Sequence, residues 1–107
     1  MANTGNSIKM EAIREIAAAA VTNVYQVFGG VLTRDSFRIV ITNATNGDLY
    51  ISTDGTTNMM KIPSGVSRIY DDKTNDSYRR KGTQFYVKYV AVPGVPSGWT
   101  GIEIEYV

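Results

Sequence analysis

Few side chains in this sequence could do chemistry, and those are oxygen and amine groups. The chain has no histidine and no cysteine, so it lacks the commonest general base, the commonest metal ligand and every thiolate. Nucleophilic schemes that pair a serine or a cysteine with a histidine are therefore excluded. We expect a protein that is not an enzyme, with no catalytic residue, no bound metal and no cofactor.

One acidic cluster has the residue types of a calcium loop. Asp72, Thr74 and Asp76 alternate along the chain, as oxygen ligands do in such loops. The glycine and the more distant bidentate glutamate that complete a calcium loop are both missing. The pattern therefore favours a solvated loop over a metal site. Glu103 and Glu105 also form a carboxylate pair, but they occupy the outward positions of an alternating strand.

The densest basic run is Arg79, Arg80 and Lys81. Such a run can contact phosphates, and Tyr78 beside it could stack on a base. Three aspartates lie a few positions upstream, and the net charge of the chain is only +1, so nucleic-acid binding is not expected. We interpret Arg79 and Arg80 as interface candidates, because arginine forms bidentate contacts with carboxylates.

The chain is rich in aromatic residues for its size, with seven tyrosines and one tryptophan in 107 residues. Aromatic side chains are favoured at interfaces because they offer large contact areas at little cost in entropy. Trp99 has three interpretations: packing at the end of a strand pair, contact with another subunit, or stacking on a sugar. The sequence leaves all three open.

The N-terminal third has the pattern of a helix. Residues 1–6 are small and polar and predict a flexible arm, and Ser7 could cap a helix over residues 7–30 that Gly29 and Gly30 would end. Apolar residues recur at intervals of three and four. A second small-sided face would either widen the contact with the rest of the domain or meet a neighbouring subunit. The interface candidates on the helix are Ala18, Ala19, Val21 and Tyr25.

After Gly30 the hydrophobic period changes to two, which indicates strands. The expected strands cover residues 37–42, 49–52, 58–62, 66–70, 84–92 and 102–107. Asn46-Gly47 and Asp54-Gly55 have the composition of hairpin turns. The expected inward residues are Phe37, Ile39, Ile41, Phe85, Val87, Tyr89, Ile102, Ile104 and Tyr106. The fold class predicted is mainly β: an antiparallel β-sandwich or small barrel over residues 31–107, with one N-terminal α-helix, in one folded unit.

The chain lacks the uninterrupted apolar segment of a secretory signal and is too polar for a membrane span. We therefore expect a soluble protein made in a cytoplasm, without a membrane partner. The sequence Asn43-Ala44-Thr45 and the sequence Asn75-Asp76-Ser77 match the glycosylation pattern. Without a secretory signal, both matches are interpreted as accidental.

The strand region resembles small virion proteins of tailed bacteriophages. The residues that carry the resemblance are RIVITNATNGDLYISTDG (38–55), IPSG (62–65), KGTQFYVK (81–88) and TGIEI (100–104). The resemblance covers about residues 34–107, and it implies a β-sandwich or barrel presented in a symmetric ring or lattice. It transfers no functional residue, because such proteins act through their surfaces.

The expected function is that of a structural subunit of a phage particle, in the neck, collar or tail. Its partners would be other copies of itself and neighbouring virion proteins, and it would have no small-molecule substrate. A capsid decoration protein is the nearest variant. A carbohydrate-binding or host-recognition module is the alternative from another class, and an exposed aromatic patch that includes Trp99 would favour it.

Overall fold

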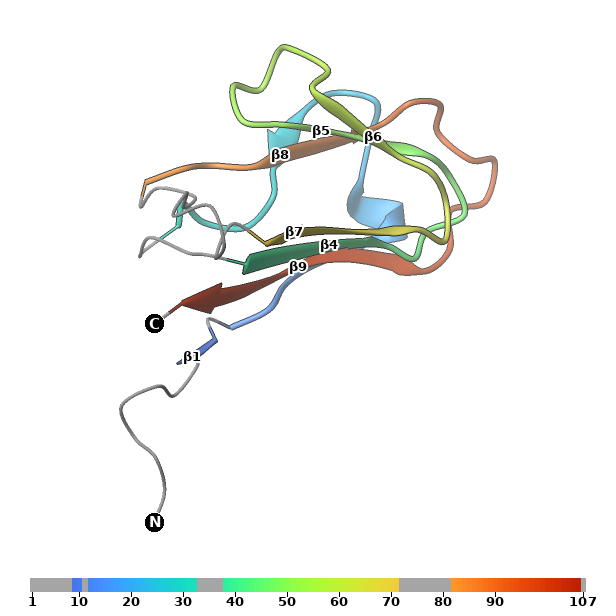
Figure 1. Ribbon diagram of the computed structural model, residues 1–107. Helices are drawn as coiled ribbons and strands as arrows, with labels where there is room; N and C mark the ends of the chain where they lie inside the picture. Colours follow the sequence, from blue (N-terminus) through green and yellow to red (C-terminus); the bar gives the residue numbers. More distant parts are fainter. Residues whose placement is uncertain (1–8, 11, 33–37, 72–81, 107) are drawn as a thin grey trace.

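The computed structural model describes residues 9–10, 12–32, 38–71 and 82–106, which form two antiparallel sheets packed face to face (Figure 1). The five-stranded sheet contains β1 (Lys9–Met10), β2 (Arg14–Ala17), β4 (Arg38–Asn43), β7 (Ser67–Asp71) and β9 (Trp99–Tyr106). The four-stranded sheet contains β3 (Gln26–Val27), β5 (Leu49–Ser52), β6 (Met60–Ile62) and β8 (Tyr86–Tyr89). The mainly β prediction is confirmed, and the two open sheets make the fold sandwich-like.

Long β9 organises the five-stranded sheet. It pairs with β4 along one side, and with β1 and β2 along the other, while β7 lies beyond β4. In the other sheet the order is β3-β8-β5-β6. The shortest edge strands, β1 and β3, have two residues each.

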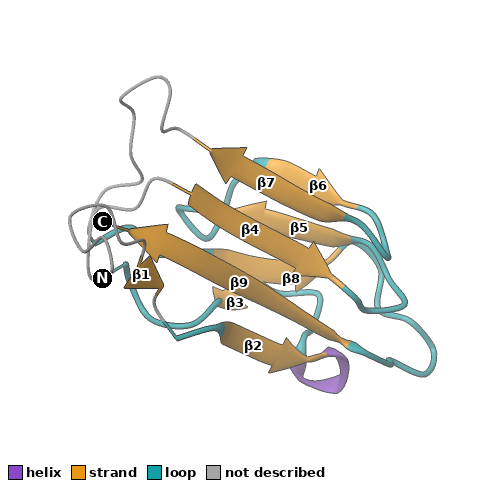
Figure 2. Cartoon of the chain, turned by 60° about the horizontal axis from the view of Figure 1, so that its bottom comes forward, coloured by secondary structure: helices purple, strands orange, loops and turns teal. Residues whose placement is uncertain are grey.

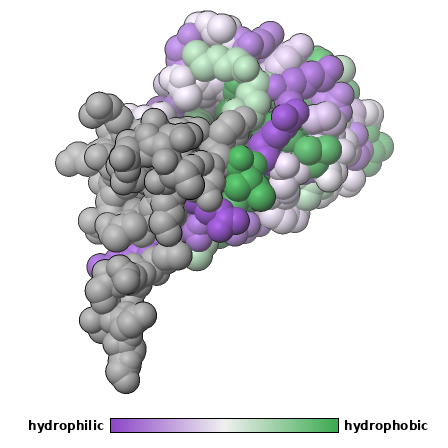
Figure 3. Space-filling model, in the orientation of Figure 1, coloured by the Kyte–Doolittle hydropathy of each residue, from purple (hydrophilic) through white to green (hydrophobic). Residues whose placement is uncertain are grey.

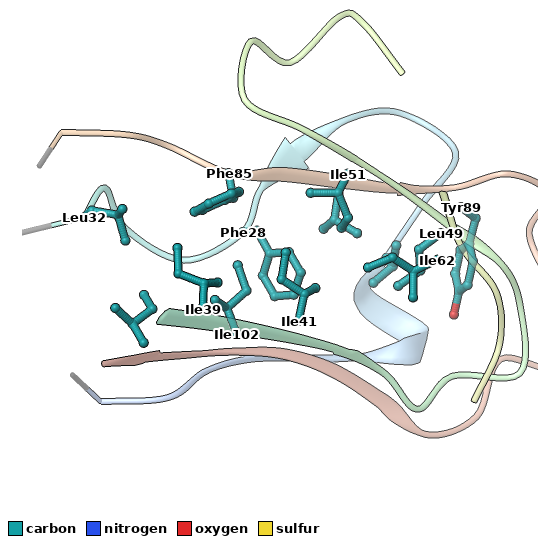
Figure 4. Close-up of a cluster of buried hydrophobic side chains, with 13 residues drawn as sticks. Phe28, Leu32, Ile39, Ile41, Leu49, Ile51, Ile62, Phe85, Tyr89 and Ile102 are labelled. Carbon is teal, nitrogen blue, oxygen red and sulfur yellow. The ribbon is translucent and has the colours of Figure 1, made fainter. Parts of the chain in front are cut away.

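The core forms between the two sheets, where the inward-pointing side chains of their strands meet (Figure 4). Alternation places every second residue of a strand on the same face, so the register that pairs Ile39 with Ile104 and Ile41 with Ile102 stacks these four side chains together. Phe85, Val87 and Tyr89 were also predicted to point inward, and they too are buried. The remaining core residues are Val21, Phe28, Leu32, Leu49, Ile51 and Ile62. Phe37 lies outside the described residues, as does the side chain of Tyr106.

The prediction of a helix over residues 7–30 is wrong for the described part of that segment. It contains three short strands and one turn of 3₁₀ helix at Ala18–Ala20. Helix propensity is a weak local preference that tertiary contacts override, and here β2 takes the free side of β9. The β-branched side chains of Ile16 in β2 and Val27 in β3 also fit strands better than helices.

The N-terminal segment crosses from one sheet to the other (Figure 2). β2 belongs to the five-stranded sheet and β3 to the four-stranded sheet, so the turn at Ala18–Ala20 lies on the crossing. The Ala18 amide donates to the Gly98 carbonyl at 3.0 Å, and the Ala18 carbonyl accepts from the Tyr89 hydroxyl at 3.0 Å. The alanine run therefore closes one side of the sandwich.

The prediction of a hairpin turn at Asn46-Gly47 is also wrong. β4 and β5 belong to different sheets, so residues 44–48 bridge the sandwich and do not join paired strands. The backbone of this bridge is held by the side chain of Asn43, and Gly47 does not have the positive φ of a type I′ turn. The second hairpin is confirmed, because β5 and β6 pair around Asp54 and Gly55, but residues 52–59 connect the paired positions in place of a two-residue turn.

The backbone conformation and the surroundings of residue 98 both require a glycine. Its φ is +91°, and a Cβ atom there would lie 2.0 Å from the Ala44 carbonyl oxygen. Gly98→Ala is expected to lower the free energy of unfolding by about 2 kcal/mol, because the new methyl group forces the backbone apart. Urea unfolding measures the change. Gly94→Ala is the matched control, since a Cβ atom at Gly94 meets nothing within 4 Å; equal losses for both variants would contradict this account.

Candidate functional site

The structure separates the interface candidates that were assigned to the N-terminal helix. Ala18 and Val21 are buried in the sandwich, whereas Ala19 is exposed on the 3₁₀ turn. Tyr25 is half-buried beside the four-stranded sheet, and Trp99 lies at the start of β9 in the other sheet. These residues therefore do not form one small-sided interface.

Several of the sequence-based candidates lie outside the described residues. They are Arg79 and Arg80 of the basic run, the acidic cluster at Asp72, Thr74 and Asp76, and the Asn75 glycosylation pattern. The other glycosylation pattern is described, and the amide of its Asn43 is buried and hydrogen-bonded within the fold. That arrangement makes Asn43 a structural residue.

Trp99 lies on the outer face of the five-stranded sheet. Ile102 and Ile104 point into the core, so alternation along β9 places Trp99 and Gly101 on the opposite face. The Trp99 ring lies over Gly101, where a Cβ atom would be only 2.8 Å from a ring carbon. The residue keeps 36% of its surface exposed. A tryptophan that rests on a glycine, with part of its surface free, presents a flat apolar area to a partner.

Polar contacts also lie on this face of the sheet. The hydroxyls of Thr42 and Ser67 lie 3.1 Å apart across β4 and β7, and Arg38 pairs with Glu105 at 3.4 Å. Ile69, on the same face of β7, is 57% exposed. Figure 3, which has the orientation of Figure 1, views the two sheets from the side, and hydrophobic residues also form separate spots there among hydrophilic residues. The outer face of the five-stranded sheet therefore combines one flat aromatic side chain, one exposed aliphatic side chain and several polar groups.

Trp99→Ala is expected to reduce the free energy of unfolding by about 1.5 kcal/mol. The reason is that the ring is only partly removed from water, so its deletion loses less than the burial of a complete aromatic side chain. Urea unfolding at low protein concentration measures the effect on the isolated subunit. A loss as large as that of a core aromatic, about 3–5 kcal/mol, would show that Trp99 acts mainly in packing.

A second candidate cluster, centred on Lys88, lies on the outer face of the four-stranded sheet. The Lys88 ammonium is 4.7 Å from the centre of the Tyr25 ring and 5.7 Å from that of Tyr50, which is cation–π distance. The Tyr25 hydroxyl donates to Asn58 Oδ1 at 2.7 Å. Partial burial, followed by the charge of Asp54, raises the pKa of Tyr25, so its hydroxyl stays protonated at neutral pH.

Asp54 organises the loop above this cluster. Its carboxylate accepts hydrogen bonds from the amides of Thr56 and Thr57, both at 2.8 Å, and from the Ser52 hydroxyl at 2.7 Å. These bonds hold the pKa of Asp54 well below its usual range. A carboxylate that is already saturated with donors from its own loop is a poor general base. Its role is to shape the connection between β5 and β6.

The described residues contain no group of three or more metal-ligating side chains that could hold an ion. The described part of the chain also contains no helix that is long and apolar enough to cross a membrane. Sequence reasoning selected Tyr25 but missed its neighbours, because Tyr25, Tyr50 and Lys88 come from three separate segments. The available signal was the alternation that places Tyr50 and Lys88 on the outward side of their strands.

Comparisons with protein-family models, curated proteins and solved structures find no match for this chain.

Proposed function

We propose that this protein is a non-enzymatic structural subunit of a tailed-phage virion. It would be made in the host cytoplasm and assemble as a homo-oligomeric ring or lattice in the neck, collar or tail region, against its own copies and neighbouring virion proteins. The sandwich-like fold and the resemblance of residues 34–107 to small phage virion proteins support this role. Capsid decoration is a variant of the same proposal.

The observation that carries the proposal is the number of large aliphatic side chains left exposed on several surfaces. Isolated exposed apolar residues are ordinary, but a ring subunit needs two different contact surfaces. Here exposed apolar residues occur on the outer face of the five-stranded sheet, near β3 and on the loop that follows β8. The residues with nearly half or more of their surface exposed include Met10, Val24, Val27, Met59, Ile69, Val92 and Val95.

Imaging the purified protein by negative-stain electron microscopy tests the assembly. We expect closed particles whose class averages show one cyclic symmetry, because each subunit of a ring is held by two contacts. A grid that contains only particles of monomer size at high protein concentration would contradict the proposal.

The cluster around Lys88 favours a second candidate, a carbohydrate-binding or host-recognition module. Tyr25 and Tyr50 offer aromatic area, and Lys88 and Asn58 offer polar groups beside it. A glycan screen with the purified protein tests this candidate. Binding that is lost in Tyr50→Ala, with the fold retained, would support it, whereas an empty screen would leave only the structural role.

A further inference from the structure

An apolar hollow opens between the two sheets. It has a volume of about 200 Å³, and the structure lines it with Ile39, Ile41, Ile51, Ser52, Thr53, Met59, Met60 and Phe85. In Figure 4, Phe85 and Ile51 point from the four-stranded sheet toward Ile39 and Ile41 of the other sheet. These four side chains are buried and form the floor.

The rim of the hollow is suited to an apolar occupant. Thr53 and Met59 are exposed, and Met60 is half-exposed. Methionine side chains are flexible and polarizable, so they adapt to an inserted group. The Met59 sulfur also lies 3.3 Å from the Thr53 hydroxyl, which keeps the two sides of the rim together.

The same chain carries a protruding apolar loop, which we call the valine loop (residues 90–98, orange at the right of Figure 1). The sequence has no charged residue between Lys88 and Glu103. Val95, near the middle of the loop, is 81% exposed, and Val92 is about half exposed. A monomer gains nothing from holding these side chains in water.

The valine loop is also held in one conformation. The Asn46 side chain donates to the Val95 carbonyl at 2.8 Å and accepts from the Ser97 amide at 3.0 Å. The Asn46 amide donates to the Ser97 carbonyl at 3.2 Å. Because the loop is already ordered, binding through it costs little conformational entropy.

The loop and the hollow lie at opposite ends of β8. Phe85, which immediately precedes this strand, belongs to the hollow, and the valine loop begins immediately after Tyr89. The loop therefore points away from the hollow of its own molecule, and only another copy can bring the two together. Contact between two different surfaces of identical subunits is head-to-tail, and such contacts generate rings when the rotation closes.

We propose that the valine loop of one subunit inserts Val95 into the apolar hollow of the next copy. This inference rests on the proposed assembly and specifies its contact. The two surfaces match in chemistry, since a rigid uncharged loop meets an apolar hollow with a methionine rim. Their separation in the fold makes the contact directional.

Two single variants and their mixture test the contact. Val95→Asp removes the apolar group that the valine loop contributes to the contact, and Met59→Glu places a charge on the rim of the hollow. Both positions are exposed, so we expect both variants to fold. Each variant alone should self-associate about thirtyfold more weakly than the unaltered protein, as expected for a central contact residue. An equimolar mixture should form 1:1 dimers and nothing larger, because each pair retains one intact loop and one intact hollow.

Light scattering after size exclusion measures each mass, and the thermal melting curve confirms that each variant is folded. Val31→Asp is the matched control, because Val31 is 46% exposed and belongs to neither the valine loop nor the lining of the hollow; it should leave the oligomer intact. An unchanged oligomer for Val95→Asp or Met59→Glu, or a mixture that stays monomeric, would overturn this contact while leaving the proposed assembly standing. A monomeric unaltered protein would overturn both.

Discussion

Replacing Ala18 with glutamate is expected to unfold the protein. Ala18 is 1% exposed, and it lies at the crossing between the sheets, where its backbone bonds both Gly98 and the Tyr89 hydroxyl. A buried unpaired carboxylate costs on the order of 5 kcal/mol. The total stability of a domain is only about 5–15 kcal/mol. We expect the far-ultraviolet circular dichroism of Ala18→Glu to lose the β signal at room temperature.

Ala19→Glu is the control, one residue along the same turn. Ala19 is exposed, so its replacement should change the free energy of unfolding by less than about 0.5 kcal/mol. The comparison also separates the two views of the alanine run. A helix with a small-sided interface would give a folded, monomeric protein for both variants, and that result would contradict the strand arrangement described above.

Asn43→Ala is expected to lower the free energy of unfolding by about 4 kcal/mol, because it leaves several buried polar groups without partners. The Asn43 Nδ2 group donates to the carbonyls of Gly47 and Ile62, each at 2.9 Å. The Oδ1 atom accepts from the Thr45 amide at 3.0 Å and from the Thr45 hydroxyl at 2.6 Å. This side chain therefore ties β4 to the start of the bridge between the sheets and to β6.

Urea unfolding measures the Asn43→Ala effect, with Asn23→Ala as the control because Asn23 is exposed. The control should stay within about 0.5 kcal/mol of the unaltered protein. A loss below about 1 kcal/mol for Asn43→Ala would show that the bridge is held by its backbone contacts alone.

The strands β4, β5 and β8 could be predicted because one face of each is buried. Alternation identified the inward residues of β4 and β8 and, in β9, Ile102 and Ile104, and these side chains form the core. Pairing was harder to predict. Asn46-Gly47 has the composition of a hairpin turn, but the chain there crosses to the other sheet, and composition does not record which strands lie on either side.

The N-terminal segment could not be predicted from its own pattern. Its apolar residues fit a helical period, but β2 gains its stability from β9, which lies about eighty residues later in the chain. Helical propensity in alanine-rich sequences is small compared with the pairing and burial that β9 provides. The helix prediction therefore failed because it weighed local preference without the distant strand.

The candidate sites follow the same rule. The sequence identified Trp99 as an interface candidate. It did not show that the ring lies over Gly101, because that contact depends on which face of β9 carries both residues. The hollow unites residues of β4, β5 and β6 with the residue that precedes β8, so no single segment carries a signal for it. The sequence analysis did not select the valine loop, because the exposure of Val92 and Val95 is evident only in the fold.

The central claim is that this protein acts by assembling with its own copies. The most direct test is its mass in solution, measured by light scattering after size exclusion across a concentration series. We predict a discrete oligomer whose mass is a whole multiple of the 11.8 kDa subunit. A mass of 11.8 kDa at every concentration would contradict the claim.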